Sequence, residues 1–190
     1  VIIKFAEDEG AAFVGGDGVG KPQGFIGGTT KVAEASWAHG SLGFVVTGGA
    51  TGFASSTAFD AIIGLQYALK AGYRNGAAFA MNRATTGEVR KIKDGQNRYI
   101  WEPGGAVGEP SSVLGYPIID MEEMPNLGAD AFPIAFGNFT RGYLIVDHGA
   151  GLRVLRDPYS SKPYVLFYTT KRVGGGVQNF EAIKLLKCAA

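Results

Sequence analysis

The sequence predicts an α+β fold in which strands outnumber helices and do not alternate with them. Apolar stretches rich in β-branched and aromatic residues occur along the whole chain of 190 residues, whereas only a few segments have helical periodicity. Glycine contributes 30 residues, about twice its average share, which indicates many turns and loops. Regularly alternating strands and helices would instead have favoured a parallel, doubly wound sheet.

The first part of the chain is predicted to hold one helix followed by long loops. Residues 1–14 are amphipathic and read as the end of a helix. Its apolar face would be formed by Ile2, Phe5, Ala6 and Phe13. The glycine-rich residues 15–28 form a loop. Residues 29–56 contain one strand candidate, 43–47, and we expect this stretch to be the least ordered and the most mobile.

A largely buried helix is predicted to start near Thr57 and to stop near Gly72. Its wide apolar face includes Ile62, Ile63 and Tyr67, with both isoleucines packed on a buried strand at 77–82. Smaller elements follow: a helix capped by Thr85 and ending at Ile92, a turn at Asp94-Gly95, a strand at 98–101, a loop at 103–110, and strands at 116–121 and 133–136.

The last third is predicted to be dominated by strands at 143–148, 152–157 and 164–172. The tetrapeptide His148-Gly149-Ala150-Gly151 indicates a hairpin that joins the first two of them. Residues 180–187 form a short element of ambiguous type.

Composition and charge exclude several classes of protein. The 18 basic and 17 acidic residues give a net charge of +1, so no basic excess points to nucleic acid as the main ligand. A single cysteine, Cys188, excludes a disulfide framework, and His39 and His148 leave little for a metal site. No apolar run is long enough to span a membrane, and no signal-peptide pattern is present.

One segment resembles a phosphate-binding loop. Residues Gly15 to Lys21 match the pattern G-x-x-x-x-G-K-[ST] up to its last position, where Pro22 lacks the hydroxyl that would hold magnesium. The loop also follows a helix, whereas the motif follows a strand. We therefore favour a connector between elements over a nucleotide-binding enzyme.

The other chemistry-bearing residues are better explained as structural or solvated side chains. His39-Gly40-Ser41-Leu42-Gly43 lacks the first glycine of a nucleophile elbow. The remaining candidates were Asp120, Glu122 and Glu123 as a solvated strand end, Cys188 as a frayed terminus, Lys171-Arg172 as a solvated basic pair, and Trp37 and Trp101 as packing anchors. The residues alone predict no catalytic, cofactor-binding or metal-binding site.

Six segments in order resemble the major capsid proteins of tailed bacteriophages, of the Hong Kong ninety-seven type, which prophages and gene transfer agents also encode. They are FAEDEGAAFVGGDGVGKPQGFI (5–26), STAFDAIIGLQYALKAGYRNGAAFAMN (56–82), KIKDGQNRYIWEPG (91–104), LGYPIIDMEEMP (114–125), IAFGNFTRGYLIVDHGAGLRVLRDPY (134–159) and VLFYTTKRVGGGVQNFEAIKLLK (165–187). Together they cover nearly the whole chain.

The resemblance implies two domains. Residues 1–28 and 140–172 would form a peripheral-type domain, with the end of the spine helix and a long β-arm. Residues 29–139 and 173–190 would form an axial-type domain near the five-fold and six-fold centres. The family's subunit usually also has a scaffolding segment, an N-terminal arm and an extended loop before the end of the spine helix. Because these are not in this sequence, we expect the chain alone to be a monomer or weak oligomer.

Some family members join subunits by a lysine–asparagine isopeptide bond that a glutamate assists. The resemblance places the asparagine near Pro163 and the glutamate near Thr170, where this chain has neither residue type. The cross-linking activity is therefore not expected here.

The function that the resemblance implies is that of a non-enzymatic subunit of an icosahedral shell around packaged DNA. Expected partners are other copies in pentamers and hexamers, a portal, scaffolding or protease proteins, and DNA bound without sequence preference. The subunit would be a virion component assembled in the bacterial cytoplasm. An encapsulin-like compartment shell has the same fold and stays open as an alternative.

Overall fold

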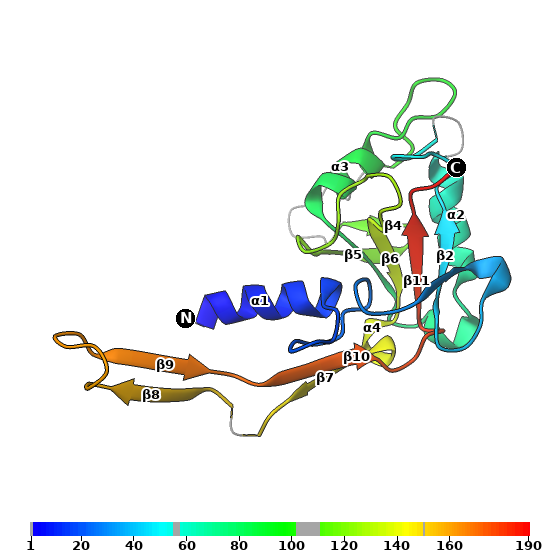
Figure 1. Cartoon of the computed structure of the whole chain (residues 1–190). Coiled ribbons are helices and arrows are strands. Elements are labelled where there is room, and N and C mark those ends of the chain that lie inside the picture. The colour runs from blue at the N-terminus through cyan, green and yellow to red at the C-terminus, as the bar shows by residue number, and fades with distance from the viewer. Residues whose placement is uncertain (1, 55–57, 102–110, 150) are drawn as a thin grey trace. The chain divides into compact units, whose positions relative to one another are not determined.

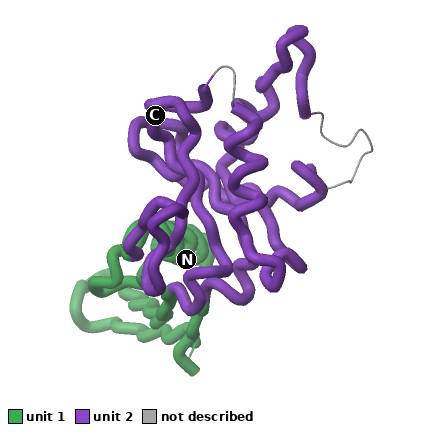
Figure 2. Tube along the Cα trace, turned by 90° about the vertical axis from the view of Figure 1, so that its right-hand side faces the viewer, with its two compact units in different colours: residues 1–28, 144–176 green, residues 29–143, 177–190 purple. Residues whose placement is uncertain are grey.

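The computed structural model describes the chain except for residues 1, 55–57, 102–110 and 150 (Figure 1). The chain divides into two compact units, coloured separately in Figure 2. Unit 1 consists of Val1–Gly28 and Leu144–Gly176, and unit 2 consists of Thr29–Tyr143 and Val177–Ala190. The boundaries near the C-terminal strands lie four residues later than the sequence-based division placed them.

Unit 2 is built on a mixed sheet of seven strands in the order β1-β2-β11-β6-β3-β5-β4. The strands are β1 (Lys31–Ala33), β2 (Leu42–Val46), β3 (Ala78–Met81), β4 (Ser112–Val113), β5 (Tyr116–Asp120), β6 (Ile134–Gly137) and β11 (Ile183–Lys187). The C-terminal strand β11 lies in the middle, parallel to β2 and antiparallel to β6. The ambiguous segment 180–187 is therefore a central strand.

The central strands β3 and β6 are apolar on both sides because both faces of the sheet are covered there. Every residue of β3 and β6 is buried, and so are the first four of β11. Such strands read as continuous apolar runs rather than alternating patterns. Gly137 is required in β6, since a Cβ there would collide with the carbonyl of Ala182.

Unit 2 also contains three helices and two 3-10 turns among its described residues. They are α2 (Ala58–Ala68), α3 (Arg83–Arg90) and α4 (Phe139–Gly142), with 3-10 turns η1 (Glu34–Ser36) and η2 (Ala71–Tyr73). Helix α2 packs against β2 and β11. The hydrophobic core gathers Ile62, Leu65, Leu69, Phe79, Met81, Val89, Trp101, Val113, Ile134, Phe136 and Leu186 around this contact.

Helix α2 differs in detail from its prediction. Its buried residues Ile62 and Leu65, followed by Leu69, are spaced by three and four, which places them on one face. Ile63 is only half-buried and Tyr67 is 73% exposed, because these two residues lie on a neighbouring face. The helix ends at Ala68 rather than Gly72, and its predicted start at Thr57 lies outside the described residues.

Three further predictions for unit 2 are corrected. The cap of α3 is Asn82 rather than Thr85: the side-chain carbonyl of Asn82 accepts a hydrogen bond from the Thr85 backbone N–H at 2.7 Å. The predicted strand 98–101 is reduced to an isolated bridge between Lys93 and Tyr99. The stretch 29–54 supplies two strands, β1 and β2, instead of one. The predicted loop at 103–110 lies outside the described residues.

Unit 1 combines one helix with two pairs of strands. They are α1 (Ile2–Gly15), β7 (Tyr143–Asp147), β8 (Arg153–Asp157), β9 (Leu166–Thr170) and β10 (Val173–Val177). β7 pairs with β10, and β8 pairs antiparallel with β9. The two pairs are called the ribbon below. The predicted hairpin at His148 to Gly151 is therefore wrong: β7 and β8 follow each other along one side of the ribbon, and the His148 N–H bonds to the Arg172 carbonyl at 3.1 Å.

Helix α1 and the glycine-rich loop form as predicted. Gly24 and Gly27 approach the end of α1 so closely that a Cβ at either would collide with the carbonyl of Val14 or Gly15. Lys171 of the ribbon forms an ion pair with Glu9 of α1 at 2.7 Å. The prediction that Ile2 belongs to the packed apolar face of α1 is wrong, since this side chain is 74% exposed.

Candidate assembly surface

The ribbon exposes large apolar side chains on both of its faces. Consecutive strand residues point to opposite faces, and consecutive residues are exposed in β7, β8 and β9. The exposed apolar residues of the ribbon and its end loop are Leu144, Ile145, Val146, Leu152, Val154, Leu155, Tyr159, Tyr164, Val165, Phe167 and Tyr168.

The strand register shows which side chains share a face. Leu155 lies opposite Tyr168, and they are 55% and 52% exposed on one face. Phe167 lies opposite Arg156 on the other face and is 64% exposed. Cross-strand neighbours of this kind stabilise a ribbon, but a two-stranded sheet on its own is marginally stable in water. Contiguous exposed apolar surface of this extent indicates a contact with another protein.

The charges around the ribbon are organised by local contacts. The hydrogen bond and charge of Glu9 raise the pKa of Lys171, whose ammonium lies 2.7 Å from Glu9 and 3.7 Å from Asp147. Hydrogen bonds from the Ser160 hydroxyl and from the Tyr159 and Ser160 backbone lower the pKa of Asp157 at the end of β8. These contacts order the helix and the end loop against the ribbon.

The phosphate-loop pattern does not form a phosphate site. Gly15 to Pro22 follows the C-terminal end of α1, whereas a phosphate site uses the free N–H groups at the N-terminus of a helix. The last carbonyls of α1 accept backbone hydrogen bonds from the returning chain, Phe13 from Phe25 at 3.2 Å and Val14 from Ile26 at 2.9 Å. Lys21 is directed to Asp17 at 3.6 Å, and the same carboxylate accepts a bond from the Val19 N–H at 3.0 Å. A Cβ at Gly16 would collide with the carbonyls of Pro22 and Ala12, and Gly18 and Gly20 adopt positive φ angles of 83° and 67°.

The other catalytic candidates are not brought together. The Ser41 hydroxyl donates to the Ala38 carbonyl at 2.7 Å, and His39 packs edge-on to Phe180 with ring centroids 5.8 Å apart. His148 belongs to the other unit. The carboxylates Asp120, Glu122 and Glu123 are exposed. Among the described residues, no cluster of three or more histidine, cysteine or carboxylate side chains could hold a metal ion.

Two predicted solvated residues are instead engaged in contacts. Cys188 is fully buried, because its backbone bonds to Ala131 and Asp130 and continues β11, and burial raises the pKa of its thiol. Lys171 pairs with Glu9 rather than standing free. Trp101 is a packing anchor as predicted: it is 8% exposed and its indole N–H donates to the Ser112 carbonyl at 2.7 Å.

A buried ion pair in unit 2 was not predicted. The ammonium of Lys184, 2% exposed, lies 2.7 Å from a carboxylate oxygen of Glu34 and 5.2 Å from the centre of the Trp37 ring. Lys70 lies over the same ring at 5.4 Å and pairs with Glu181. The sequence signal for this network is Lys184, which stands between the apolar residues Ile183 and Leu185.

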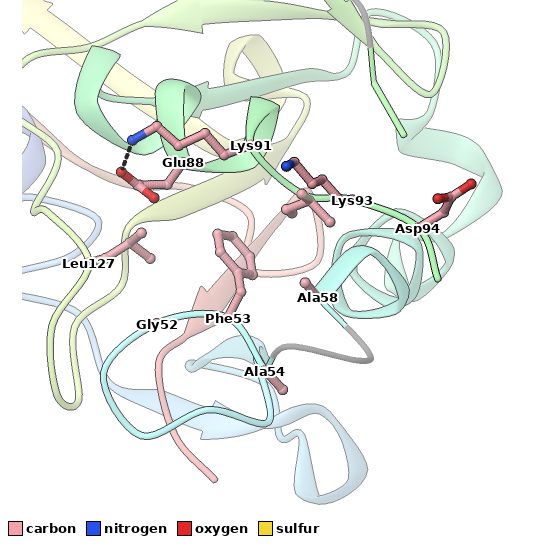
Figure 3. A pocket seen from close by; sticks show the side chains of 10 residues that line it. Gly52, Phe53, Ala54, Ala58, Glu88, Lys91, Lys93, Asp94 and Leu127 are labelled. Atoms are coloured by element: carbon pink, nitrogen blue, oxygen red, sulfur yellow. Dashed lines mark hydrogen bonds and ion pairs between the residues drawn. The ribbon is translucent and has the colours of Figure 1, made fainter. Parts of the chain in front are cut away.

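An open pocket lies at the edge of the core of unit 2. It has a volume of about 560 Å³, an apolar lining from Phe53, Ala58, Ile92 and Leu127, and an ion pair between Glu88 and Lys91 at 2.7 Å (Figure 3). Figure 3 shows the Phe53 ring in the middle of the lining, between Leu127 and Ala58.

The resemblance assigns the family's cross-linking positions to Pro163 and Thr170. Pro163 lies in the loop between β8 and β9, and Thr170 ends β9. Neither side chain can form or assist an isopeptide bond. Among the described residues, no helix is both long and apolar enough to cross a membrane.

Solved structures similar to this chain are capsid proteins. Capsids of an empty and of a native GTA (gene transfer agent) particle, both computed with C5 symmetry, each share 54% sequence identity and a TM-score of 0.93 over 100% of this chain. The chain spans 64% and 63% of those two chains. A structure of Gordonia phage Cozz has 15% identity and a TM-score of 0.59, with 98% of this chain and 60% of that chain covered, which shows a common fold. No curated protein matches the chain.

A family model described as the phage capsid family matches residues 2–188. This match spans both units, from α1 through the ribbon to β11. The α+β fold and the resemblance seen in the sequence are thereby confirmed, and the chain belongs to the phage capsid family.

Proposed function

We propose that this chain is a structural subunit of an icosahedral shell of the gene transfer agent or phage type, which encloses packaged DNA. The observation that carries the proposal is the ribbon, whose two faces expose apolar side chains such as Leu155 and Phe167. An apolar ribbon of this kind is stabilised when other chains cover it, as repeated contacts in a shell do. The 54% identity to capsids of particles computed with C5 symmetry supports self-association in rings.

In this proposal unit 1 corresponds to the peripheral domain and unit 2 to the axial domain. The helix–ribbon arrangement of unit 1 and the mixed sheet of unit 2 support the assignment. Copies of the chain assemble in pentamers and hexamers in the bacterial cytoplasm, with a portal and scaffolding or protease proteins as further partners. The net charge of +1 suits a lining that touches DNA without binding it tightly, because phosphate contacts dominate such affinity.

The subunit acts without catalysis in this proposal. The geometry around Lys21, Ser41 and Asp120 supports a structural role, since each side chain is either in a local contact or exposed. No observation favours the nucleotide-binding enzyme or the encapsulin-like compartment.

The test is to produce the complete subunit that contains this chain in bacteria and to image the product by electron microscopy. Closed shells with five-fold vertices are the expected product, and co-production with the packaging machinery should protect DNA inside them from nuclease. A discrete small oligomer that never closes, even with its scaffolding partner, would overturn the proposal. Shells that enclose a protein cargo instead of DNA would favour the encapsulin-like alternative.

A further inference from the structure

A small hairpin of unit 2 projects apolar side chains into solvent. It runs from Ile92 to Trp101, turns at Asp94 to Asn97, and is closed by the bridge between Lys93 and Tyr99. Tyr99 is 56% exposed and Ile100 is 41% exposed. Exposed apolar residues at a hairpin are costly in water unless a partner covers them.

The hairpin is held in one shape before any partner arrives. The Asp94 carboxylate accepts bonds from the Gln96 N–H at 2.8 Å and the Arg98 N–H at 2.9 Å, and it pairs with the Arg98 guanidinium at 2.9 Å. These backbone bonds lower the pKa of Asp94. The Lys93 ammonium lies 5.1 Å from the centre of the Tyr99 ring. Because the hairpin is already ordered, it loses little conformational entropy when it binds a partner.

The pocket of Figure 3 adjoins this hairpin, and its lining is complementary to the hairpin in apolar surface and in charge. Its apolar lining of Phe53, Ala58 and Leu127 suits an aromatic or aliphatic side chain, and about 560 Å³ is room for the side chains of a tyrosine and an isoleucine. Its Glu88–Lys91 pair offers one charge of each sign. The Asp94–Arg98 pair of the hairpin offers the same two charges, so the two surfaces can meet with opposite charges facing each other.

Hairpin and pocket share Ile92, Lys93 and Asp94, so they lie next to each other on one chain. A knob and a hole that adjoin on one chain make a head-to-tail contact, which forms a ring when the rotation between copies closes. In a ring, the pocket of one copy must coincide with the hairpin of the next. Because hairpin and pocket are close together on one chain, this is possible only if both lie close to the rotation axis. The contact therefore belongs near the centre of a ring of copies.

We propose that Tyr99 and Ile100 of one copy insert into the pocket lined by Phe53, Ala58 and Leu127 of the next copy in the ring. The inference rests on the proposed function. It names the residues through which neighbouring copies contact each other near the rotation axis of the ring. The contact is smaller than the roughly 1,200 Å² that a stable interface buries, so it sets the angle between neighbours and acts together with the other contacts of the shell.

The test is site-directed disulfide cross-linking between two singly substituted subunits. Complete subunits carrying Tyr99→Cys and complete subunits carrying Leu127→Cys are co-assembled and oxidised. A cross-linked dimer should form in the mixture and not with either variant alone, because each chain then carries only one half of the pair. The native Cys188 is buried and stays out of the reaction. A matched control pairs Leu127→Cys with Tyr67→Cys, which is 73% exposed on α2 of the same unit, lies outside the proposed contact and should give no dimer.

The outcomes separate the contact from the shell itself. Shells that assemble from the mixture but show no cross-link between positions 99 and 127 would overturn the contact and leave the proposed function standing. Equal cross-linking in Tyr99→Cys alone would also overturn it. Failure of the unsubstituted subunit to form any ring or shell would count against both. As a second measurement, Tyr99→Ala should weaken ring association on the order of tenfold or more without shifting the melting temperature.

Discussion

At the scale of single residues, Lys184 shows how one side chain organises its neighbourhood. It stands in the central strand β11 with 2% of its side chain exposed, and Glu34 supplies the opposite charge at 2.7 Å. Its ammonium and that of Lys70 both lie over the Trp37 ring. A buried charge is tolerated only when it is paired. The pair thus ties the turn η1, at the edge of the sheet, to its centre.

Removing the partner of Lys184 should cost more than removing Lys184 itself. Glu34→Gln leaves an uncompensated buried ammonium and should lower the free energy of unfolding by about 3 kcal/mol. Lys184→Met leaves only Glu34, which is 35% exposed and reaches water, so the cost should be smaller. Urea unfolding of the two single variants and of the double variant gives the free energies of unfolding to be compared. Strictly additive effects of the two substitutions would show that the pair is not coupled.

Burial of Cys188 should make stability depend on alkaline pH. Burial raises the pKa of the thiol above its ordinary value of 9.0, so the unfolded chain ionises first. This contribution to stability is complete below the ordinary pKa and is lost as the pH rises above it. Melting temperatures between pH 8 and pH 10 should fall less steeply for Cys188→Ala than for the unsubstituted chain. Tyr143→Phe is the control: burial raises the pKa of Tyr143 to about 12 from 10.0, so its effect starts at higher pH. Parallel curves for the unsubstituted chain and Cys188→Ala would contradict the prediction.

At the scale of elements, helix α2 shows why a wide apolar face does not say which residues are buried. The face that packs on β2 and β11 carries Ile62 and Leu65, which are 1% and 0% exposed. Ile63 and Tyr67 belong to the same apolar stretch in the sequence but face away from the centre of the contact. The rotation of the helix about its axis decides the difference.

Truncation of the two adjacent isoleucines should separate these environments. Ile62→Ala removes a fully buried side chain from the core and should cost roughly 2–5 kcal/mol. Ile63→Ala should cost clearly less, since its side chain is half-buried and leaves a smaller cavity. Denaturant unfolding of both variants gives the comparison. An equal or larger loss for Ile63→Ala would show that α2 is rotated differently on the sheet.

The stretch before α2 should be more protected than its composition suggested. β2 pairs with β1 on one side and with β11 on the other, and Leu42 is fully buried. Amide hydrogens of Leu42–Val46 should therefore exchange slowly, which replaces the expectation of mobility for the whole of residues 29–56. Hydrogen exchange followed by mass spectrometry tests it. Exchange in β2 as fast as in the exposed turn at Asp94 to Asn97 would restore the original expectation.

At the scale of the whole molecule, the two units differ in where their apolar side chains lie. Unit 2 contains the hydrophobic core around Ile62 and Phe79, whereas the ribbon of unit 1 leaves apolar side chains exposed on both faces. Substitutions on the ribbon should therefore affect association rather than the folding of unit 2.

The double substitution Leu155→Ser and Tyr168→Ser should abolish shell assembly with little change in melting temperature. Both side chains are more than half exposed, so their loss removes contact surface and little core. Lys21→Ala is the matched control, because the half-exposed Lys21 pairs with the exposed Asp17, and it should leave assembly and stability unchanged. Electron microscopy and differential scanning calorimetry give the two readouts. Normal shells from the doubly substituted subunit would remove the ribbon from the assembly surface.

The fold class, the family and most of the strands could be predicted from the amino-acid sequence. Buried strands such as Ala78–Met81 are continuous apolar runs, and their burial follows from local composition. Asn82 before α3 carried a capping signal that could have been read from its residue type. At Gly15 to Lys21, Pro22 already breaks the phosphate-loop pattern in the sequence, and in the structure Lys21 pairs with Asp17.

Only the tertiary structure decided which strands pair and which side chains meet. β7 and β8 have the pattern of a hairpin, yet β7 pairs with the distant β10 and β8 pairs with β9, because pairing depends on the whole ribbon rather than on one turn. Lys184 and Glu34 are 150 residues apart, and no local pattern links them. The hairpin at Tyr99 and the pocket at Phe53 likewise adjoin only after folding. Contacts between distant residues depend on chain geometry, which local propensity does not contain.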